Sequence, residues 1–468
     1  MQVILAGYNV DKDVLEELKS SGRPRSDVTP ETLSASYARI SRDPRPINEL
    51  RQVARQEVEK ARKSNSTIIF KMGHHSIAEH AVFNFDILGV SRLALEEIEK
   101  FRLCAYTEKS QRYQKLGDDF VMPEEIKGTD NENRFSDTVK QQNAFYHELV
   151  GKGIEPEDAR YITSLATQGQ VGQTINARNL EYLFRRFASH RLAEVKQLGL
   201  EMYRLVEPIA PSIILFTEAN AYDQQTGVEL AQLTSKFNSG AKKAKNEVEL
   251  VDFSRDADNK LVATLLHAST DLTFKKCLKQ AKLMDEPEKL ELIKSCFKYA
   301  EFYDRARREF EFVDLTYDLV VSAACFGQLK RHRMASLISQ PYDPRLGVTI
   351  PEAITRAGLA REFEKIVNIT NRTYNKLAAG DRSAAQYVLT NAHRRRVLIK
   401  VNARELYHVS RLREDKHAQW DIQRIAAGMS AAARKVMPLT MLFIGGKDIY
   451  PEVYERQFGQ RPKVEPQY

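Results

Sequence analysis

The 468-residue sequence is poor in cysteine and in long hydrophobic runs. Its four cysteines, Cys104, Cys277, Cys296 and Cys325, lie far apart and form no C-x-x-C pair. This spacing excludes a dense disulfide framework and predicts free, buried thiols without a zinc site. Uninterrupted apolar runs stay below ~18 residues, which excludes a membrane-spanning helix at the level of sequence.

The beginning of the chain also lacks targeting features. Residues Met1–Gly7 form a short strand-like run without a basic leader or a cleavage signature, so we expect a cytoplasmic protein. The length exceeds what one hydrophobic core usually organises and predicts two or three domains. An excess of 71 basic over 63 acidic residues favours anionic ligands such as nucleotides or anionic cofactors.

The sequence repeats once, at a spacing close to half its length. The segment Lys100–Ala105 has a counterpart 231 residues later in Arg331–Ser336. A second pair, Asn176–Leu180 and Asn402–Leu406, repeats at a spacing of 226 residues. Two such pairs in the same order indicate a fused gene duplication.

We predict the seam between the copies in the polar segment 217–246, which ends in the Gly-Ala-Lys-Lys-Ala-Lys run at 240–245. We expect this seam to be irregular and solvated. The predicted organisation is a first repeat over 1–222, a linker over 223–246 and a second repeat over 247–468.

Alternating polarity predicts a strand in each copy, at Val82–Ile87 and at Phe312–Tyr317, because a half-buried strand has a period of two. The run Val248–Phe253 predicts the strand that restarts the second copy. Helical patterns surround these strands over Ile47–Lys63, Leu93–Phe101, Leu180–Leu205, part of Glu288–Phe312 and Glu405–Met429. The predicted class is α+β, with two similar domains.

Several spaced words carry a family resemblance. They are GHHSIAEH at 73–80, SQRY at 110–113, RHRMAS at 331–336, and Asn-Ala-Arg at both 176–178 and 402–404. Together with the segment 404–423 they resemble the flavin-dependent thymidylate synthases. The resemblance implies an antiparallel sheet flanked by long helices, with the two domains fused as a pseudo-dimer. It also implies methylation of dUMP to dTMP, with methylenetetrahydrofolate as carbon donor and NADPH-reduced FAD as hydride source.

The two copies depart from the family pattern in opposite ways. Copy one reads Lys100–Ala105 where the family has R-H-R-x-x-S, but it keeps the following loop Glu108–Tyr113. Copy two keeps the R-H-R word, whereas its later loop has Pro341 and Asp343 where the family has Ser and Arg. An acidic residue therefore replaces a phosphate-binding arginine in copy two.

The resemblance implies a nucleotide site to which both copies contribute. Copy one would supply Glu108, Ser110, Gln111, Arg112 and Arg160, and copy two would supply Gln328, Arg331 and Arg413. Arginine suits this task because its planar fork of donors binds phosphate bidentately and stays charged. Arg413 and Arg331 would be the catalytic residues, with Arg413 stabilising negative charge on the uracil.

The same resemblance implies a set of FAD-binding residues, namely His74, Ser76, Arg331, His332, Arg333, Asn402, Arg404, His408 and His417. Taken alone, the histidines of the first word are more often structural. Their spacing, His75-x-x-x-Glu79-His80, matches no zinc motif, so we predict no metal site. In copy two, Glu311 alone keeps its position by spacing.

Three features allow alternative interpretations. A gapless register puts Phe187 opposite Arg413, whereas a one-residue deletion would put Arg186 there. The run His393–Arg396 is more typical of a solvated face than of a nucleic-acid patch, and the resemblance implies that it lies near the nucleotide site. Cys325 in its apolar context is more consistent with core packing than with reactivity.

Two other functions remain open. The motif losses also fit a related flavoenzyme that acts on another pyrimidine nucleotide. The net charge of +8 fits a non-catalytic paralogue that binds a nucleotide or a nucleic acid, although a nucleic-acid partner is less expected. We expect small-molecule nucleotide and folate partners, no membrane association, and a homodimer that mimics a family tetramer.

Overall fold

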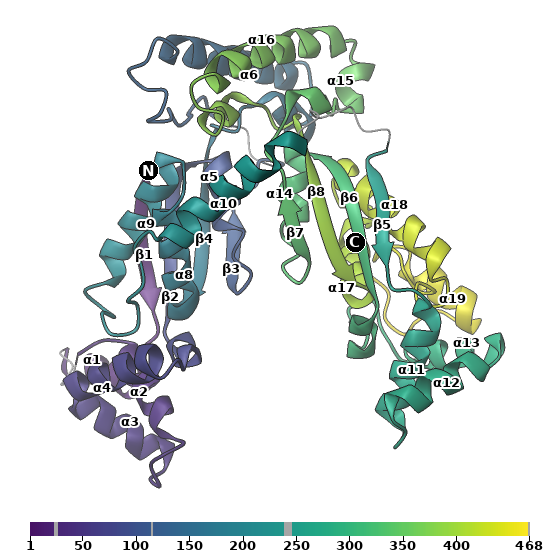
Figure 1. The fold of residues 1–468 in the computed structure, drawn as a ribbon. Coiled ribbons are helices and arrows are strands. Elements are labelled where there is room, and N and C mark those ends of the chain that lie inside the picture. Colours follow the sequence, from purple (N-terminus) through teal and green to yellow (C-terminus); the bar gives the residue numbers. More distant parts are fainter. Residues whose placement is uncertain (23–26, 114–115, 238–245, 467–468) are drawn as a thin grey trace. The chain divides into compact units, whose positions relative to one another are not determined.

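The computed structural model describes residues 1–22, 27–113, 116–237 and 246–466. The chain divides into two compact units, of which unit 1 comprises Met1–Gly240 and Arg356–Thr390. Unit 2 comprises Ala241–Thr355 and Asn391–Tyr468. Each unit contains a four-stranded antiparallel sheet with helices around it (Figure 1), which confirms the α+β class.

The sheet of unit 1 has the strand order β1-β2-β4-β3. Its strands are β1 (Gln2–Tyr8), β2 (Val82–Ser91), β3 (Cys104–Glu108) and β4 (Gln168–Asn176). The alternation that predicted β2 is real, because Phe83, Phe85 and Ile87 are buried while the residues between them face solvent. The predicted strand is confirmed and continues to Ser91.

The sheet of unit 2 has the same topology, in the order β5-β6-β8-β7. Its strands are β5 (Val248–Phe253), β6 (Asp314–Ser322), β7 (Ser336–Ser339) and β8 (Arg394–Asn402). Strand β5 has the predicted bounds. Strand β6 begins two residues later than predicted, because Phe312 ends the short helix η5 (Arg308–Phe312).

Three of the long predicted helices are pairs of shorter helices. They are α3 (Ile47–Gln56) with α4 (Val58–Ser66), α8 (Ala177–Ala188) with α9 (Ala193–Val206), and α17 (Ala403–Arg413) with α18 (Trp420–Val436). The first pair is broken at Glu57, whose backbone angles, φ −122° and ψ 57°, lie outside the helical region. Hydrophobic periodicity alone did not reveal these breaks.

The remaining helical elements complete each unit. Unit 1 also has α1 (Lys12–Ser21), α2 (Glu31–Arg39), η1 (Thr67–Lys71), η2 (His75–His80), α5 (Arg92–Ile98), α6 (Glu132–Gly151), α7 (Pro156–Ala159), η3 (Arg160–Ile162), α10 (Ala221–Thr234), η4 (Ser235–Phe237), α16 (Ala360–Ala378) and η7 (Ala384–Val388). Unit 2 also has α11 (Ala257–Ser269), α12 (Phe274–Leu283), α13 (Glu286–Ser295), α14 (Ala323–Leu329), η6 (Pro344–Leu346) and α19 (Tyr450–Phe458), while α15 (Glu352–Arg356) ends at the division between the units.

Helix α16 comes from the second half of the sequence but packs in unit 1 against α6. The hydroxyl groups of Thr138 and Thr373 lie 2.8 Å apart, and Gln142 donates to Thr370 Oγ1 at 2.8 Å. Both hydrogen bonds are buried. Unit 1 therefore includes a segment, Arg356–Thr390, that belongs to the second half of the sequence.

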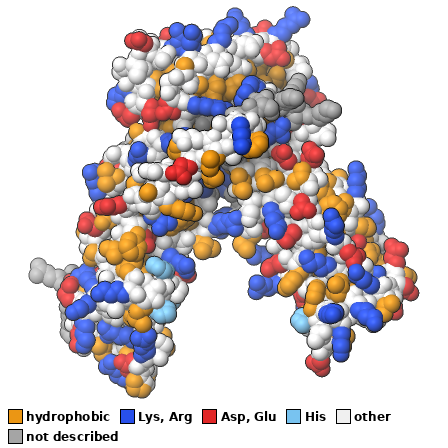
Figure 2. Space-filling model, viewed as in Figure 1, with side chains coloured by type: hydrophobic (Ala, Val, Ile, Leu, Met, Phe, Trp, Pro, Cys, Tyr) orange, Lys and Arg blue, Asp and Glu red, His pale blue; other side chains and the backbone are white. Residues whose placement is uncertain are grey.

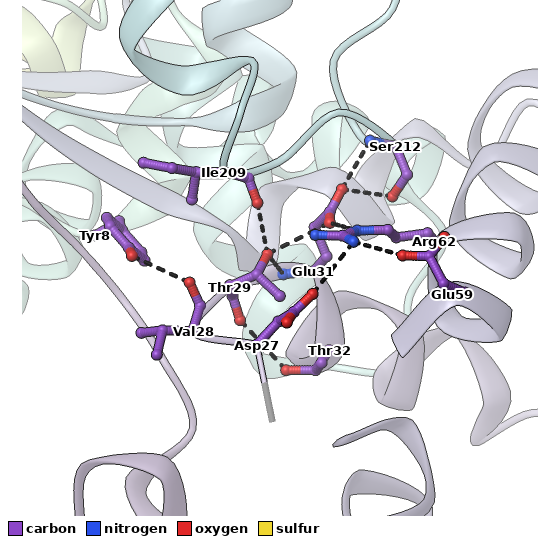
Figure 3. Close-up of polar contacts among 10 residues, drawn as sticks. All are labelled: Tyr8, Asp27, Val28, Thr29, Glu31, Thr32, Glu59, Arg62, Ile209 and Ser212. Carbon is purple, nitrogen blue, oxygen red and sulfur yellow. Dashed lines mark hydrogen bonds and ion pairs between the residues drawn. The ribbon is translucent and has the colours of Figure 1, made fainter. Parts of the chain in front are cut away.

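In each repeat, an acidic side chain near the start accepts hydrogen bonds from a residue near the end. Glu31 is fully buried, pairs with Arg62 Nε at 2.6 Å and accepts from Ser212 N and Oγ at 2.7 and 2.6 Å (Figure 3). In unit 2, Asp258 accepts from Thr440 N and Oγ1 at 2.7 and 2.6 Å. The recurrence of this contact at corresponding places is a second sign of the duplication.

The predicted seam differs from expectation. It contains helix α10, which Asn220 caps by accepting a hydrogen bond from Asp223 N at 2.8 Å, so the segment is not irregular throughout. The basic run at 240–245 lies outside the described residues.

The four cysteines are free thiols, and all but Cys296 are buried, as Cys325 was expected to be. Among the described helices, none combines the length and the apolar character that crossing a membrane requires.

The arginine run of copy two is not a solvated face, contrary to expectation. Arg394–Arg396 begin the central strand β8, and His393 directly precedes it. His393 and Arg395 are buried. The Arg395 guanidinium lies 4.6 Å from the ring centre of Phe326 and 4.2 Å from that of Tyr342. Stacking on two aromatic faces explains how a cation is accommodated in the interior.

Candidate functional site

The loop after β3 gathers three of the predicted nucleotide-binding residues around Glu157. Ser110 Oγ accepts from Arg112 N at 3.1 Å, and Arg112 Nε lies 2.6 Å from the Glu157 carboxylate. Arg160 Nε donates to the Glu157 carbonyl oxygen at 3.1 Å. Gln111 is buried beside them. Unit 1 therefore brings Ser110, Arg112 and Arg160 together, as predicted.

A further arginine, Arg92, belongs to this cluster and was not predicted. It starts α5, is buried, and donates to Glu108 Oε1 at 3.1 Å. Burial lowers the pKa of Arg160, and the nearby positive charges of Arg92 and Arg112 lower it further. Guanidinium groups that repel one another in this way gain from a bound dianion, so the cluster is suited to a phosphate monoester. An arginine in the first turn of an otherwise buried helix was the available signal.

Unit 2 brings together Gln328, His332 and Arg413. The Arg413 guanidinium donates from Nε to His332 Nε2 at 2.9 Å and from Nη2 to the Gln328 carbonyl oxygen at 3.2 Å. The Gln328 side chain lies 3.4 Å from the amide oxygen of Gln419, which caps α18. Two acceptors therefore hold the guanidinium plane of Arg413 in one orientation.

The protonation state of His332 follows from its surroundings. Burial, with a smaller effect from the Arg413 cation, lowers the pKa of His332 to about 3. The imidazole is therefore neutral at neutral pH. Because Arg413 Nε can only donate, His332 Nε2 accepts and the ring proton lies on Nδ1, 3.5 Å from the Glu405 carboxylate. Burial raises the pKa of Glu405.

Other predicted flavin-site residues of unit 2 have structural contacts of their own. Arg404 pairs with Glu311 Oε1 at 2.6 Å and donates to the Ala306 carbonyl oxygen at 2.7 Å. Asn402 caps α17 by accepting from Glu405 N at 2.8 Å. The ring of His408 lies 5.7 Å from that of His332. Glu311, which was expected to keep its family position by spacing, therefore pairs with the arginine of the Asn-Ala-Arg word.

The remaining predicted residues lie on exposed backbone turns. His74 follows Gly73, whose φ of 77° suits glycine, and precedes η2, which contains Ser76. Both side chains are exposed. In unit 2, Arg331 and Arg333 flank His332 just after α14, and His417 lies between α17 and α18. These hydroxyl, imidazole and guanidinium groups are donors that fit the phosphates of a dinucleotide such as FAD.

The words of the two copies make corresponding contacts. Glu79 of the first word pairs with Arg178 of the first Asn-Ala-Arg word, as Glu311 pairs with Arg404 in unit 2.

Within the described part of the chain, no group of three His, Cys, Asp or Glu side chains could hold a metal ion.

The structure decides the uncertain register in copy one. Ring centres of Phe101 and Phe187 lie 5.8 Å apart, and those of Phe101 and Tyr182 lie 5.6 Å apart. With the helix caps Asn176 and Asn402 aligned, these residues occupy the positions of His332, Arg413 and His408. Phe187 is therefore the counterpart of Arg413.

The alternative counterpart, Arg186, is engaged elsewhere. Its Nη1 atom lies 2.9 Å from the carboxylate of Asp223, at the start of α10, and Arg185 Nε lies 3.0 Å from the same carboxylate. The shifted register therefore does not describe the folded chain.

The family model described as thymidylate synthase complementing protein matches residues 26–212 and 249–439. The chain belongs to this family. Because the same model matches two successive segments, the predicted family and the internal duplication are both confirmed.

Curated relatives agree with this membership. The chain is 35% identical over 193 residues to a flavin-dependent thymidylate synthase of Geobacter sulfurreducens, covering 39% of this chain and 80% of that protein. It is 33% identical over 156 residues to a flavin-dependent thymidylate synthase of Pyrococcus abyssi, covering 32% and 62%. These relatives support a methyltransferase-type enzyme family that uses a flavin.

Two further matches differ in extent. A UPF0159 protein of Chlamydia muridarum is 23% identical over 429 residues and aligns with 83% of this chain and 81% of its own length. Among solved structures, a UMP/dUMP methylase, PolB from Streptomyces cacaoi bound with 5-Br dUMP, covers 45% of this chain and 92% of its own at 18% identity, with a TM-score of 0.36. The chlamydial protein is thus similar along most of the fused pair.

Proposed function

We propose that this chain is a flavin-dependent thymidylate synthase that methylates dUMP to dTMP. Methylenetetrahydrofolate would donate the carbon, and FAD reduced by NADPH would supply the hydride that completes the methyl group. The observation that carries the proposal is the complementarity of the two units. An arginine cluster suited to a phosphate is kept in unit 1, and a preorganised His332–Arg413 pair is kept in unit 2.

The residues of unit 1 have the chemistry to bind the nucleotide phosphate. Arg112 and Arg160 would contact the phosphate oxygens, Ser110 would add a hydroxyl donor, and Gln111 would contact the sugar. Arg92 would hold Glu108 in place through their ion pair. Charge-assisted hydrogen bonds of this kind are shorter and about twice as strong as neutral ones.

The residues of unit 2 have the chemistry to act on the base. Arg413, oriented by His332 and by the Gln328 carbonyl oxygen, would stabilise the negative charge that develops on the uracil carbonyl oxygen. A neutral His332 leaves the full positive charge of Arg413 available, since it adds no competing cation beside it. Arg331 and the Gln328 side chain would bind the same nucleotide.

The flavin would be held by donors that both units keep. His74 and Ser76 of unit 1, and Arg331, His332, Arg333, Asn402, Arg404, His408 and His417 of unit 2, form the proposed set. The site would need residues of both units, taken from one chain or from two. A homodimer of the fused chain would then correspond to four copies of the repeat, and we propose that it works in the cytoplasm.

On the face drawn in Figure 2, the charge distribution favours a small anionic ligand over a nucleic acid. In Figure 2, basic side chains lie among acidic ones on both units, and no continuous basic stripe is visible on this face. A flavoenzyme that acts on another pyrimidine nucleotide differs from the proposal only in the nucleotide that it takes. Flavin oxidation with dUMP, measured against other uridine nucleotides, separates these two functions.

The test is the visible absorption spectrum of the purified protein reconstituted with FAD, before and after addition of dUMP. The proposal expects a bound flavin whose spectrum dUMP perturbs, and formation of dTMP when NADPH and methylenetetrahydrofolate are added. A protein that binds no flavin after reconstitution contradicts it.

A further inference from the structure

The two units also contain the positions at which a second nucleotide site would be built. These positions are the loop after β7 in unit 2 and the segment after α5 in unit 1. Each position can be compared with its intact counterpart in the other unit. The comparison rests on the proposed function, because it asks how many such sites the chain has.

The loop of unit 2 is closed on itself. Asp343 stands where unit 1 has Arg112, caps η6 by accepting from Arg345 N at 2.9 Å, and pairs with the Arg345 guanidinium through both carboxylate oxygens, at 2.5 Å for the shorter contact. Asp343 is also largely buried. A carboxylate at this place repels a phosphate, whereas unit 1 has a guanidinium there.

The space beneath this loop is also filled. Arg395 donates from Nε to the Gln340 carbonyl oxygen at 2.7 Å while stacking on Phe326 and Tyr342. Pro341, at the place of Ser110, has neither the hydroxyl nor the backbone N–H that the intact loop offers. At the two positions of Ser110 and Arg112, the loop of unit 2 therefore lacks the hydroxyl, the backbone N–H and the guanidinium that unit 1 has there.

The matching segment of unit 1 is closed by aromatic packing. Phe101 and Phe187 fill the positions of His332 and Arg413 and are both buried, so no guanidinium reaches this place from α8. Neither of these two rings has a donor that could stabilise charge on a uracil.

The carboxylate of Glu97 adds to this closure. It stands where unit 2 has Gln328, 2.6 Å from Lys100 Nζ and 3.4 Å from His190 Nε2. Burial alone would raise the pKa of Glu97, but the positive charges of Lys100 and His190 hold it below its usual range. Lys100, which replaces Arg331, pairs with this carboxylate, while its own side chain is 51% exposed.

We infer that each chain binds one nucleotide, because the second pair of half-sites has lost the hydroxyl, guanidinium and imidazole groups that the first pair keeps. Two independent closures support this number, one in each unit. The charged groups Glu97 and Asp343 at these positions are then not required for nucleotide binding.

Equilibrium dialysis of FAD-loaded protein against radiolabelled dUMP counts nucleotides per chain directly. The inference expects a plateau at one dUMP per chain. A plateau at two overturns the inference while the proposed function stands, whereas no binding at any concentration overturns both.

Two variants test the closures themselves. Glu97→Gln and Asp343→Asn, with Asp343→Ala as a second variant of the same position, should keep one dUMP per chain with affinity within about threefold of the wild type. Flavin content reports that each variant is folded. A loss of dUMP affinity beyond tenfold in folded Glu97→Gln or Asp343→Asn protein would place these residues in a working site and overturn the inference.

Discussion

The most informative comparison lies between the ends of two equivalent helices, α8 in unit 1 and α17 in unit 2. The end of α17 presents Arg413 to a buried, neutral His332. The corresponding end of α8 presents Phe187 to Phe101. One fold therefore tolerates either a polar pair or an apolar pair at the same place. The apolar pair contributes packing, and only the polar pair can donate hydrogen bonds to a ligand.

The largest expected effect is on the stability of unit 1. Phe187 is buried, and a Cβ atom added at Gly199 would lie 2.8 Å from Phe187 Cβ, so α9 packs tightly against this ring. We expect Phe187→Ala to lower the free energy of unfolding by about 3–5 kcal/mol, measured by urea denaturation. The exposed Leu412 on the equivalent helix is the control, and Leu412→Ala should change it by less than about 1 kcal/mol. Equal losses would mean that the two helix ends are packed alike.

The next effect is on catalysis. We expect Arg413→Gln to lower the rate of dTMP formation about 100- to 1000-fold at unchanged flavin content, because an oriented charge donor is lost. Arg186→Gln is the matched control, since this arginine is paired with Asp223 and should leave the rate within about twofold. A comparable loss in Arg186→Gln would restore the shifted register.

A smaller effect distinguishes the two units by pH. The folded pKa of His332 is about 3 against an ordinary value of 6.5, so below pH 6.5 the unfolded chain binds a proton that the folded chain does not. Stability is therefore full above pH 6.5 and is lost as the pH falls toward 3, by about 3 kcal/mol at pH 4. His332→Phe places a phenylalanine here, as Phe101 does in unit 1, and this loss of stability at low pH should then be absent.

The measurement is the urea midpoint of the wild type and of His332→Phe at pH 7 and at pH 4. The urea midpoint of the variant, relative to that of the wild type, should be higher at pH 4 than at pH 7. Parallel pH curves would show that the imidazole is not held neutral in the folded state.

The smallest effect concerns the matching ion pairs. The side chains of Glu79 and Arg178 are 38% and 50% exposed, whereas those of Glu311 and Arg404 are 28% and 30% exposed. We expect Glu79→Gln to cost less than about 0.5 kcal/mol and Glu311→Gln up to about 1 kcal/mol in thermal unfolding. A larger cost in Glu79→Gln would indicate that the exposed pair is coupled to other charges.

Much of the fold could be predicted where the local pattern is strong. Strands β2 and β5 follow from alternating polarity, and the recurring words locate the duplication. Strand β8 could not be recognised, because its Arg-Arg-Arg opening hides a buried arginine that depends on stacking with Phe326 and Tyr342. Such stacking joins distant segments and leaves no local signal.

The candidate site was predictable only in part, for the same reason. Sequence words located Arg112, Arg160 and Arg413, because these residues stand in recognisable spacings. They did not locate Arg92, whose role depends on its distance from Glu108 and Arg160. Nor did they reveal that α16 packs with unit 1, since that contact is made by buried hydrogen bonds between residues more than 200 positions apart.

The central claim is that the units have kept complementary parts of one nucleotide site. The most direct test is the dUMP affinity of FAD-loaded Arg112→Ala and Arg331→Ala proteins, each measured by titration of the flavin spectrum. The account predicts that each substitution alone lowers the affinity at least about 100-fold, because each removes a charge-assisted contact to the same ligand. Wild-type affinity in either variant, with flavin bound, would contradict the account.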